Sequence, residues 1–313
     1  MSETVKPKAT RVAYGETLAA LGEKYPNVVA LDADLSKSTK SELFAKRFPE
    51  RFFQMGIAEQ NMAGVAAGLA NAGKTAFCSS FACFLAGRFE TIKMSVAYAQ
   101  ANVKVVGTHA GVAVGADGYS QMGLEDLALM RSLPGMTVYQ PADDLETAQI
   151  VEHLCADPAP AYLRLTRHNV PRVHAEGYRF EPGKLDVLRQ GVDVALLTGG
   201  GVVGQTLQAA DLLKQDGIDA AVINVPTIKP IDAEGLSDWA GRVPLMVSVE
   251  DHNVLGGQGS AIAEVVASLG KARLHIHGVR DVFGESGSQA ELYRKHGLDA
   301  AGITAAVRNA RGG

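Results

Sequence analysis

Short apolar runs alternate with longer amphipathic stretches along most of this chain of 313 residues. The short runs are rich in β-branched and aromatic residues, as buried strands are, and the longer stretches repeat apolar residues every three or four positions, as helices do. In the first half the expected strands are 28–31, 75–79, 103–107, 136–139 and 161–165, and the expected helices are 10–25, 62–70, 89–101 and 145–155. This alternation predicts a mostly parallel sheet with helices on both faces.

The pattern breaks between residues 174 and 191, where Gly177, Pro182 and Gly183 favour turns, and we interpret this range as a linker. A second unit follows, with expected strands at 194–198, 220–225, 245–249 and 274–276 and expected helices at 203–215 and 260–269. The predicted fold class is α/β with two doubly wound domains, residues 1–173 and a smaller domain of residues 192–313. The chain is long enough for two domains of ~100–200 residues each.

Composition excludes several classes of partner. The net charge is −4 and charged residues make up 20% of the chain, so no basic surface is expected to bind nucleic acid or an anionic membrane. No apolar run reaches the ~18 residues that a membrane-spanning helix needs. The three cysteines, Cys78, Cys83 and Cys155, form no CxxC pair and suggest no disulfide framework. We therefore expect a soluble, cytoplasmic protein.

Glu59 stands directly before a run of small apolar residues, 65–70. One interpretation places it in the first turn of a helix, where free amides and the helix dipole favour a carboxylate. The other interpretation is a buried carboxylate whose partner is a cofactor, because burying such a group without a partner costs several kcal/mol, roughly.

Segments in other parts of the chain help to decide between these two interpretations of Glu59. Gly56-Ile-Ala-Glu-Gln-Asn61 resembles the pyrimidine-binding motif of the transketolase family of thiamine diphosphate enzymes, and residues 107–118 with 124–130 resemble that family's substrate loop. Thr10-Arg11, Leu31-Asp-Ala-Asp-Leu-Ser-Lys-Ser38 and Tyr162-Leu-Arg-Leu-Thr-Arg167 match further motifs in family order. The resemblance covers nearly the whole chain and implies the fold expected above.

The resemblance implies that Glu59 activates thiamine diphosphate by contacting its pyrimidine ring. Phe81 and Phe84 match the aromatic wall for that ring, although aromatic residues at this spacing also occur in ordinary cores. Asp34 is expected near the thiazolium side of the cofactor. Gln121 is assigned to the same cofactor site and, with Glu59, to catalysis.

The sugar phosphate substrate is implied to contact residues from several segments. The matching positions are Arg11, Ser38, His109, Asp117 and Arg167. Arginine suits a phosphate because its guanidinium forms forked hydrogen bonds, but any one of these arginines could be a surface ion pair. His109 is also implied to be catalytic. Asp117 matches an aspartate that binds a sugar hydroxyl, and it is equally suited to a turn.

Three residues, Tyr119, Ser120 and Gln121, depart from the bacterial pattern of this loop, in which many transketolases have Gly-Pro-Thr-His. This chain has Gly118-Tyr-Ser-Gln121. Gln121 therefore replaces a histidine that contacts the donor. Animal-type transketolases resemble this chain, because they also have a glutamine at this position. A glutamine donates and accepts hydrogen bonds but exchanges no proton. Ketol transfer is thus expected to survive, whereas proton exchange at this position is not, and Tyr119 leaves the sugar preference open.

The second domain contains two glycine-rich segments. Gly199, Gly201 and Gly204 have the spacing of a phosphate-binding loop, but the next strand lacks the acidic residue that would bind a ribose, so tight packing is the preferred interpretation. Residues 250–259 resemble the family's C-terminal domain. His252 within them is expected to pack or hydrogen-bond rather than to catalyse.

The family's diphosphate-binding domain, with Gly-Asp-Gly and a metal-binding asparagine, has no counterpart in this sequence. The resemblance therefore implies a separate N-terminal transketolase subunit that holds the diphosphate and Mg²⁺ or Ca²⁺. No metal ligand is assigned to this chain. The expected assembly is a heterotetramer.

The function implied is that of the C-terminal subunit of a split transketolase, which moves a two-carbon ketol unit from a ketose phosphate to an aldose phosphate. One alternative with the same fold and glutamate is a β subunit of a 2-oxoacid dehydrogenase or a deoxyxylulose-phosphate synthase fragment. Another is a non-catalytic scaffold. Converging polar residues argue against the scaffold, because burying them is costly unless they serve a site.

Overall fold

The first sheet has seven strands in the order β10-β5-β6-β4-β3-β1-β2 in the computed structural model, which describes residues 6–312. The strands are β1 (Val28–Asp32), β2 (Phe52–Gln54), β3 (Thr75–Phe81), β4 (Val103–Thr108), β5 (Thr137–Tyr139), β6 (Ala161–Arg164) and β10 (Thr227–Lys229). All neighbours pair in parallel except β10, which pairs antiparallel with β5. The mostly parallel sheet is confirmed; β10 was not expected.

Helices cover both faces of this sheet, because successive strand residues point to opposite sides. On one face Val28 and Ala30 pack with α1 (Thr10–Leu21), α3 (Glu42–Arg47) and α8 (Asp144–Ala156). On the other face Val29 and Leu31 pack with α4 (Glu59–Asn71), the π-helix η2 (Ile92–Tyr98) and α7 (Asp126–Arg131). The smaller helices are α2 (Ser36–Thr39), α5 (Ala82–Ala86) and α6 (Phe89–Thr91), with 3₁₀ turns at Pro49–Arg51, Val112–Val114 and Tyr119–Gln121.

The second sheet has five strands in the order β12-β11-β8-β9-β7. They are β7 (Asp186–Arg189), β8 (Val194–Thr198), β9 (Ala220–Asn224), β11 (Leu245–Asn253) and β12 (Arg273–Val279). Its helices are α9 (Val203–Gln215), α10 (Ala233–Arg242), α11 (Gln258–Val266), α12 (Gln289–His296) and α13 (Ala300–Gly312), and a 3₁₀ turn spans Gly200–Val202. Strand β7 lies inside the range interpreted as a linker and pairs antiparallel with β9.

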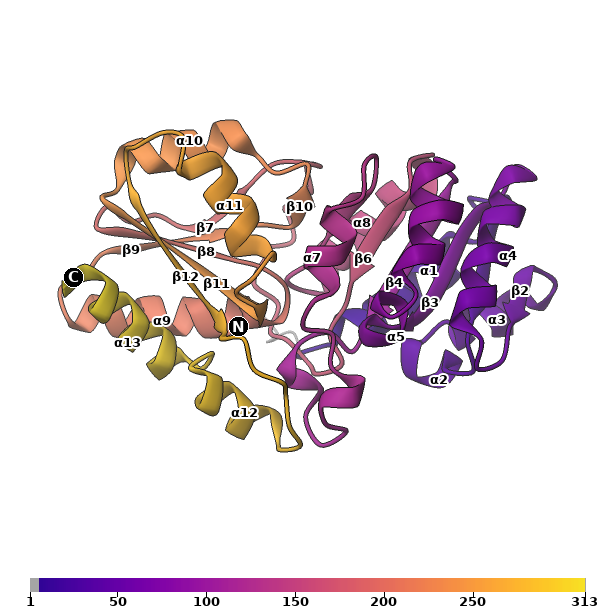
Figure 1. Ribbon diagram of the computed structural model, residues 1–313, viewed down its shortest axis with the longest axis horizontal. Helices are drawn as coiled ribbons and strands as arrows, with labels where there is room; N and C mark the ends of the chain where they lie inside the picture. The colour runs from indigo at the N-terminus through magenta and orange to yellow at the C-terminus, as the bar shows by residue number, and fades with distance from the viewer. Residues whose placement is uncertain (1–5, 313) are drawn as a thin grey trace.

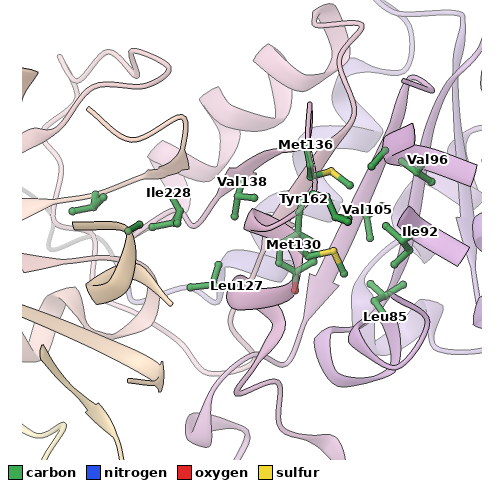
Figure 2. Packing of buried hydrophobic residues seen from close by; sticks show 14 of the residues in the cluster. Leu85, Ile92, Val96, Val105, Leu127, Met130, Met136, Val138, Tyr162 and Ile228 are labelled. Carbon is green, nitrogen blue, oxygen red and sulfur yellow. The ribbon is translucent and has the colours of Figure 1, made fainter. Parts of the chain in front are cut away.

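The two domains lie side by side (Figure 1). One cluster of buried apolar residues includes members from the sheets of both domains. Figure 2 shows Ile228 of β10 beside Val138 of β5, with Leu127 of α7 below them. An ion pair between Arg164 Nε and Asp126 Oδ2, 2.8 Å long and buried, lies in the same region, and Arg164 also donates to the backbone oxygen of Asp251 in β11. These contacts fix the second domain against the first.

In the part of the chain that the structure describes, we find no helix with the length and apolar character required to span a bilayer.

Candidate functional site

The expected site residues follow the carboxyl ends of neighbouring parallel strands. Asp34 and Ser38 come after β1, Phe81 ends β3, His109 follows β4 and Arg167 lies after β6. Parallel strands place these ends at one edge of the sheet, which is where open α/β folds bind ligands. The strand order β6-β4-β3-β1 therefore brings together residues that are far apart in sequence.

Glu59 is the first residue of α4, and its side chain is buried, with 6% exposed. Its Oε1 accepts a hydrogen bond from Ser80 Oγ at 3.1 Å. Glu59 also lines an open hollow of about 600 Å³ with Asn61 and Arg88. Both sequence interpretations are thus compatible with the geometry: the carboxylate lies in the first helical turn and borders a hollow large enough for a ligand.

Three aromatic rings stack on one another beside this edge. Phe81 and Phe84 stack with centroids 5.4 Å apart and an interplanar angle of 10°. The His109 ring stacks on Phe81 at 3.7 Å and 20°. An apolar wall therefore borders the site, as a flat heterocycle requires.

His109 is buried and has a positive φ of 57°, a conformation that few non-glycine residues adopt. Its Nδ1 lies 2.9 Å from Thr108 Oγ1. Burial, and to a smaller extent the nearby charges of Arg11 and Arg167, lower the pKa of His109 to about 3. The ring is neutral at physiological pH.

Arg11 and Arg167 border a second hollow of about 440 Å³. Arg11 donates to the backbone oxygen of Ser38, and its buried Nε has no hydrogen-bond partner among residues 6–312. Arg167 donates to the Val114 backbone oxygen and lies 3.5 Å from Asp117 Oδ1. The pKa of Arg11 is lowered by burial and by Arg167, so the two cations are close enough to repel each other. An anion in this hollow would relieve that repulsion.

Asp34 and Gln121 are not joined to this group by any hydrogen bond or ion pair within residues 6–312. Asp34 is exposed with a φ of 64°, and its backbone N–H donates to Gln54 Oε1. Asp32 is the buried carboxylate of that segment and accepts from Thr39 and Ser41 hydroxyls. Gln121 donates to Ser120 Oγ at 3.3 Å.

Sequence reasoning missed Ser80 and Thr108, which contact Glu59 and His109. The signal was present: both are hydroxyl residues within one position of the carboxyl end of a strand. It also missed Asp251, whose Oδ1 accepts the backbone N–H of Val112 and so anchors the loop that carries Asp117.

The glycines of the second domain pack closely, as the preferred interpretation expected. A Cβ atom at Gly199 would lie 2.3 Å from Gln140 Nε2, and one at Gly204 would lie 2.7 Å from Pro171. His252 is fully buried, and its Nδ1 bonds the Asn253 backbone oxygen at 2.7 Å. These residues serve the contact between the domains.

Comparison with known protein families assigns both domains. Residues 6–173 match the pyrimidine binding domain of transketolase, and residues 183–303 match the transketolase C-terminal domain.

Full-length similarity extends to several proteins. The chain is 46% identical to a putative transketolase C-terminal section from Methanocaldococcus jannaschii, covering 95% of this chain and 94% of that protein. It is 40% identical to the 6-deoxy-6-sulfo-D-fructose transketolase subunit SqwH of Clostridium sp. strain MSTE9, covering 95% and 92%. It is 38% identical to human transketolase, of which it spans only 48%.

Among solved structures, a split gene transketolase described as an inactive β4 tetramer superposes with a TM-score of 0.88 at 46% identity, covering 97% of this chain and 98% of that one. Transketolase from Campylobacter jejuni shares the fold, with a TM-score of 0.83 at 21% identity over 99% of this chain and 48% of that one. The chain belongs to the transketolase family, in the group formed by the C-terminal subunits of split transketolases.

Proposed function

We propose that this chain is the C-terminal subunit of a thiamine diphosphate-dependent transketolase that transfers a two-carbon ketol unit from a ketose phosphate to an aldose phosphate. One observation carries the proposal. A buried carboxylate, a stack of aromatic rings and two arginines that share one nearby carboxylate, Asp117, meet at one edge of the first sheet. These are the features needed to hold a heterocycle and a phosphorylated sugar side by side.

The residues present fit the pyrimidine end of thiamine diphosphate. Glu59 has a single side-chain hydrogen bond within residues 6–312, so its second oxygen is free for a ring nitrogen. Phe81 and Phe84 offer the flat apolar surface that the ring would contact. When bound, the cofactor supplies the carbon nucleophile that attacks the ketose carbonyl. Glu59 holds or shares a proton at its carboxyl group, where partial desolvation strengthens the hydrogen bond.

The remaining residues bind and orient the sugars. Arg11 and Arg167 hold the phosphate with charge-assisted hydrogen bonds, supported by the backbone around Ser38. Asp117 accepts a sugar hydroxyl, and His109 contacts the sugar between the phosphate and the cofactor. Asp34 and Gln121 remain candidates for the cofactor side, reached after the partner subunit has bound. Correct positioning of two substrates contributes to the rate by removing orientational freedom before the reaction.

A separate N-terminal subunit completes the site and holds the diphosphate with Mg²⁺ or Ca²⁺. Ile57, at the mouth of the Glu59 hollow, is 85% exposed, and Tyr98 of η2 is 80% exposed. A Cβ atom at Gly64 or Gly68 of α4 would meet nothing within 4 Å. An open helix face with exposed apolar side chains beside a buried carboxylate supports a protein partner at this surface. The expected complex is a heterotetramer of two copies of each subunit.

The test is reconstitution with the N-terminal subunit, thiamine diphosphate and Mg²⁺, followed by an assay of ketol transfer between a ketose phosphate and an aldose phosphate. Glu59→Gln is expected to lower kcat roughly 10²–10⁴-fold, the usual contribution of a proton-transfer group. The matched control is Glu90→Gln, because Glu90 is exposed on α6. Near-normal kcat in the Glu59→Gln complex would refute the assignment.

The same complex separates this function from its closest alternative. A 2-oxoacid dehydrogenase or deoxyxylulose-phosphate synthase would release carbon dioxide from pyruvate, whereas ketol transfer releases none. The paired Arg11 and Arg167 support a phosphorylated substrate. Carbon dioxide release without ketol transfer would replace the proposal by that alternative.

A further inference from the structure

Residues 112–124 form a loop that the second domain holds at both ends. At one end Asp251 Oδ1 of β11 accepts the backbone N–H of Val112 at 2.8 Å. At the other end the backbone N–H of Asn253, also in β11, donates to the Leu124 backbone oxygen at 2.9 Å. Val112 and Leu124 are buried. Strand β11 therefore fixes where the loop begins and ends, but not the path of the residues between.

The middle of this loop has a different environment. Tyr119 begins a 3₁₀ turn, with Asp117 two residues before it and Gln121 two residues after it. Asp117 and Tyr119 are exposed. Within residues 6–312, no hydrogen bond or ion pair joins residues 115–121 to the second domain. Any support that the second domain gives to this part of the loop therefore comes from packing.

The packing partner is the segment of residues 281–288, which follows β12. A Cβ atom at Gly118 would lie 2.7 Å from Ser286 Oγ, and a Cβ atom at Gly115 would lie 3.2 Å from the Gly287 backbone oxygen. Both loop glycines also have a positive φ, 81° and 84°, which other residues rarely adopt. The two segments therefore run close together, and a side chain at either loop glycine would be both strained and crowded.

Phe283 of this segment places its ring against Tyr119. The ring centroids lie 4.8 Å apart at an interplanar angle of 60°, close to the edge-to-face arrangement that aromatic pairs favour. Phe283 is 77% exposed, and the pair borders an open hollow of about 410 Å³ together with Glu125 and Asn253. Because open space lies beside the pair, little other packing restrains the Tyr119 ring on this side. The contact with Phe283 thus joins the second domain to the start of the 3₁₀ turn.

We propose that Tyr119 and Phe283 are positioning residues: Phe283 holds Tyr119 at the start of the 3₁₀ turn and so keeps Asp117 and Gln121 in place on either side of it. Through this contact the second domain takes part in substrate binding. The roles of Asp117 and Gln121 rest on the proposed function. The support of the loop by Phe283 does not rest on it, because both rings belong to this chain.

Hydrogen exchange of the chain alone, measured by mass spectrometry of peptides within residues 112–124, tests this support. The reporting groups are the backbone amides of Gln121 and Met122, which donate to backbone oxygens of the turn at 3.1 and 2.9 Å. Phe283→Ala is expected to raise their exchange rates roughly 2–10-fold, the factor that one aromatic pair contributes, because local opening becomes easier. Phe283→Tyr keeps the ring and is expected to exchange like wild type.

The matched control is Val192→Ala. Val192 is also an exposed apolar residue of the second domain, but it lies in the turn between β7 and β8. This variant is expected to leave the exchange of the loop unchanged. Equal exchange rates in Phe283→Ala and wild type overturn the proposal. A rise of the same size in Val192→Ala also overturns it, because such a rise would reflect a general loosening of the second domain.

A double-variant cycle tests whether the two rings act through one contact. In that case Tyr119→Ala and Phe283→Ala raise the exchange of the turn by similar factors, and the double variant raises it no further than either change alone. Factors that multiply in the double variant would mean that the rings act independently. The proposal would then fail.

A proline at position 119 supplies the restraint in another way. Tyr119→Pro fixes φ at the start of the turn without any contact from Phe283. The Tyr119 N–H makes no backbone hydrogen bond within residues 6–312, and the ψ of Gly118 is −178°, far from the helical values that a following proline disfavours. Adding Tyr119→Pro to Phe283→Ala is therefore expected to return the exchange of the turn toward wild type. If this double variant exchanges as fast as Phe283→Ala, restraint of the turn is not what Phe283 provides, and the proposal is wrong.

Kinetics of the reconstituted complex test the consequence for the substrate. The kcat/KM for the ketose phosphate is expected to fall roughly 2–10-fold in Phe283→Ala and to recover in Phe283→Tyr. A purely structural role would lower the free energy of unfolding of Phe283→Ala and leave kcat/KM of the folded complex unchanged. That outcome would overturn the link between this contact and substrate binding.

The two proposals fail separately. A complex that transfers no ketol unit under any condition refutes the proposed function, while hydrogen exchange of the chain still decides whether Phe283 supports the loop. A competent complex in which Phe283→Ala changes neither kcat/KM nor the exchange of the loop refutes only the further inference.

Discussion

Two buried histidines of this chain have opposite electrostatic surroundings. Within residues 6–312, His109 at the candidate site has no carboxylate partner, and its pKa falls to about 3 through burial and two nearby arginines. His174, at the junction of the domains, lies 2.8 Å from Asp143 and 3.0 Å from Asp186. Burial alone would lower the pKa of His174, but its hydrogen bonds to these aspartates raise that pKa to about 10.

The two histidines differ in how many of their ring nitrogens have a hydrogen-bond partner. Both ring nitrogens of His174 have carboxylate partners, and Tyr178 stacks on the ring at 3.9 Å. His109 uses one nitrogen and leaves the other free. Full pairing holds the His174 ring in place, whereas a free nitrogen in a dry, positive environment is suited to a ligand. Burial alone therefore does not distinguish a structural histidine from one that is suited to a ligand.

The largest expected effect concerns His174, the structural histidine of this comparison. Asp143 accepts from the ring and backbone of His174, from the backbone of Val173, and from Glu146 as the N-cap of α8. Asp143→Ala leaves a buried imidazolium without its main partner, so we expect the free energy of unfolding to fall by about 3–5 kcal/mol. Urea unfolding followed by circular dichroism measures it. A loss below about 1 kcal/mol would mean that this cluster does not stabilise the fold.

The next largest expected effect concerns the candidate phosphate hollow, which lies on the ligand-binding side of this comparison. Arg11→Met removes a cation of the candidate phosphate hollow, and a lost charge-assisted hydrogen bond of ~1.5–3 kcal/mol corresponds to roughly 10–150-fold in affinity. We expect KM for the sugar phosphate to rise by that factor in the reconstituted complex, with little change in unfolding. Arg308→Met is the matched control, because Arg308 forms an exposed ion pair with Asp216. Equal KM values for the two variants would contradict a phosphate site at Arg11.

Local patterns predicted most of the strands of both sheets and several of the longer helices, but not α10, α12 or α13. The runs at 194–198 and 203–215 coincide with β8 and α9, because a buried parallel strand and a long amphipathic helix each have a strong local pattern. Strands β7 and β10 were not predicted. Each is short and lies at a sheet edge, and each pairs antiparallel with a distant strand, so its conformation is set by tertiary pairing rather than by its own residues.

The candidate site also contains some residues that the sequence predicted and others that it did not. Family motifs predicted Glu59, His109, Arg11 and Arg167, and the parallel sheet brings their segments to one edge. Ser80 and Thr108 escaped prediction because a hydroxyl residue near a strand end has no pattern of its own. Their contacts with Glu59 and His109 follow only from the register that sets Ser80 opposite Gly107. The roles of Asp34 and Gln121 stay predictions, since both depend on surfaces that a partner would cover.

A smaller effect concerns the pH dependence of stability at the junction. The pKa of His174 is about 10 in the folded chain and near 6.5 when unfolded, so between these values the folded state holds the extra proton. Stability from this group is therefore complete below pH ~6.5 and is lost as pH rises toward 10, by at most ~1.4 kcal/mol per pH unit. Urea unfolding of the wild type and His174→Gln from pH 6.5 to 10 measures the difference. A difference that does not change with pH would show that His174 is neutral in the fold.

The smallest expected effect has the opposite sign and belongs to His109. Its folded pKa of about 3 lies below the unfolded value, so between about pH 3 and 6.5 the unfolded chain binds the extra proton. Stability contributed by this neutral ring therefore decreases as pH falls, and His109→Gln should lose less stability than wild type between pH 6.5 and 5. Comparing the two histidine variants in one pH series removes contributions from the other titrating groups, because each variant deletes a single proton site. If both slopes had the same sign, the two rings would share one charge state, and the contrast between a ligand-facing histidine and a structural one would not hold.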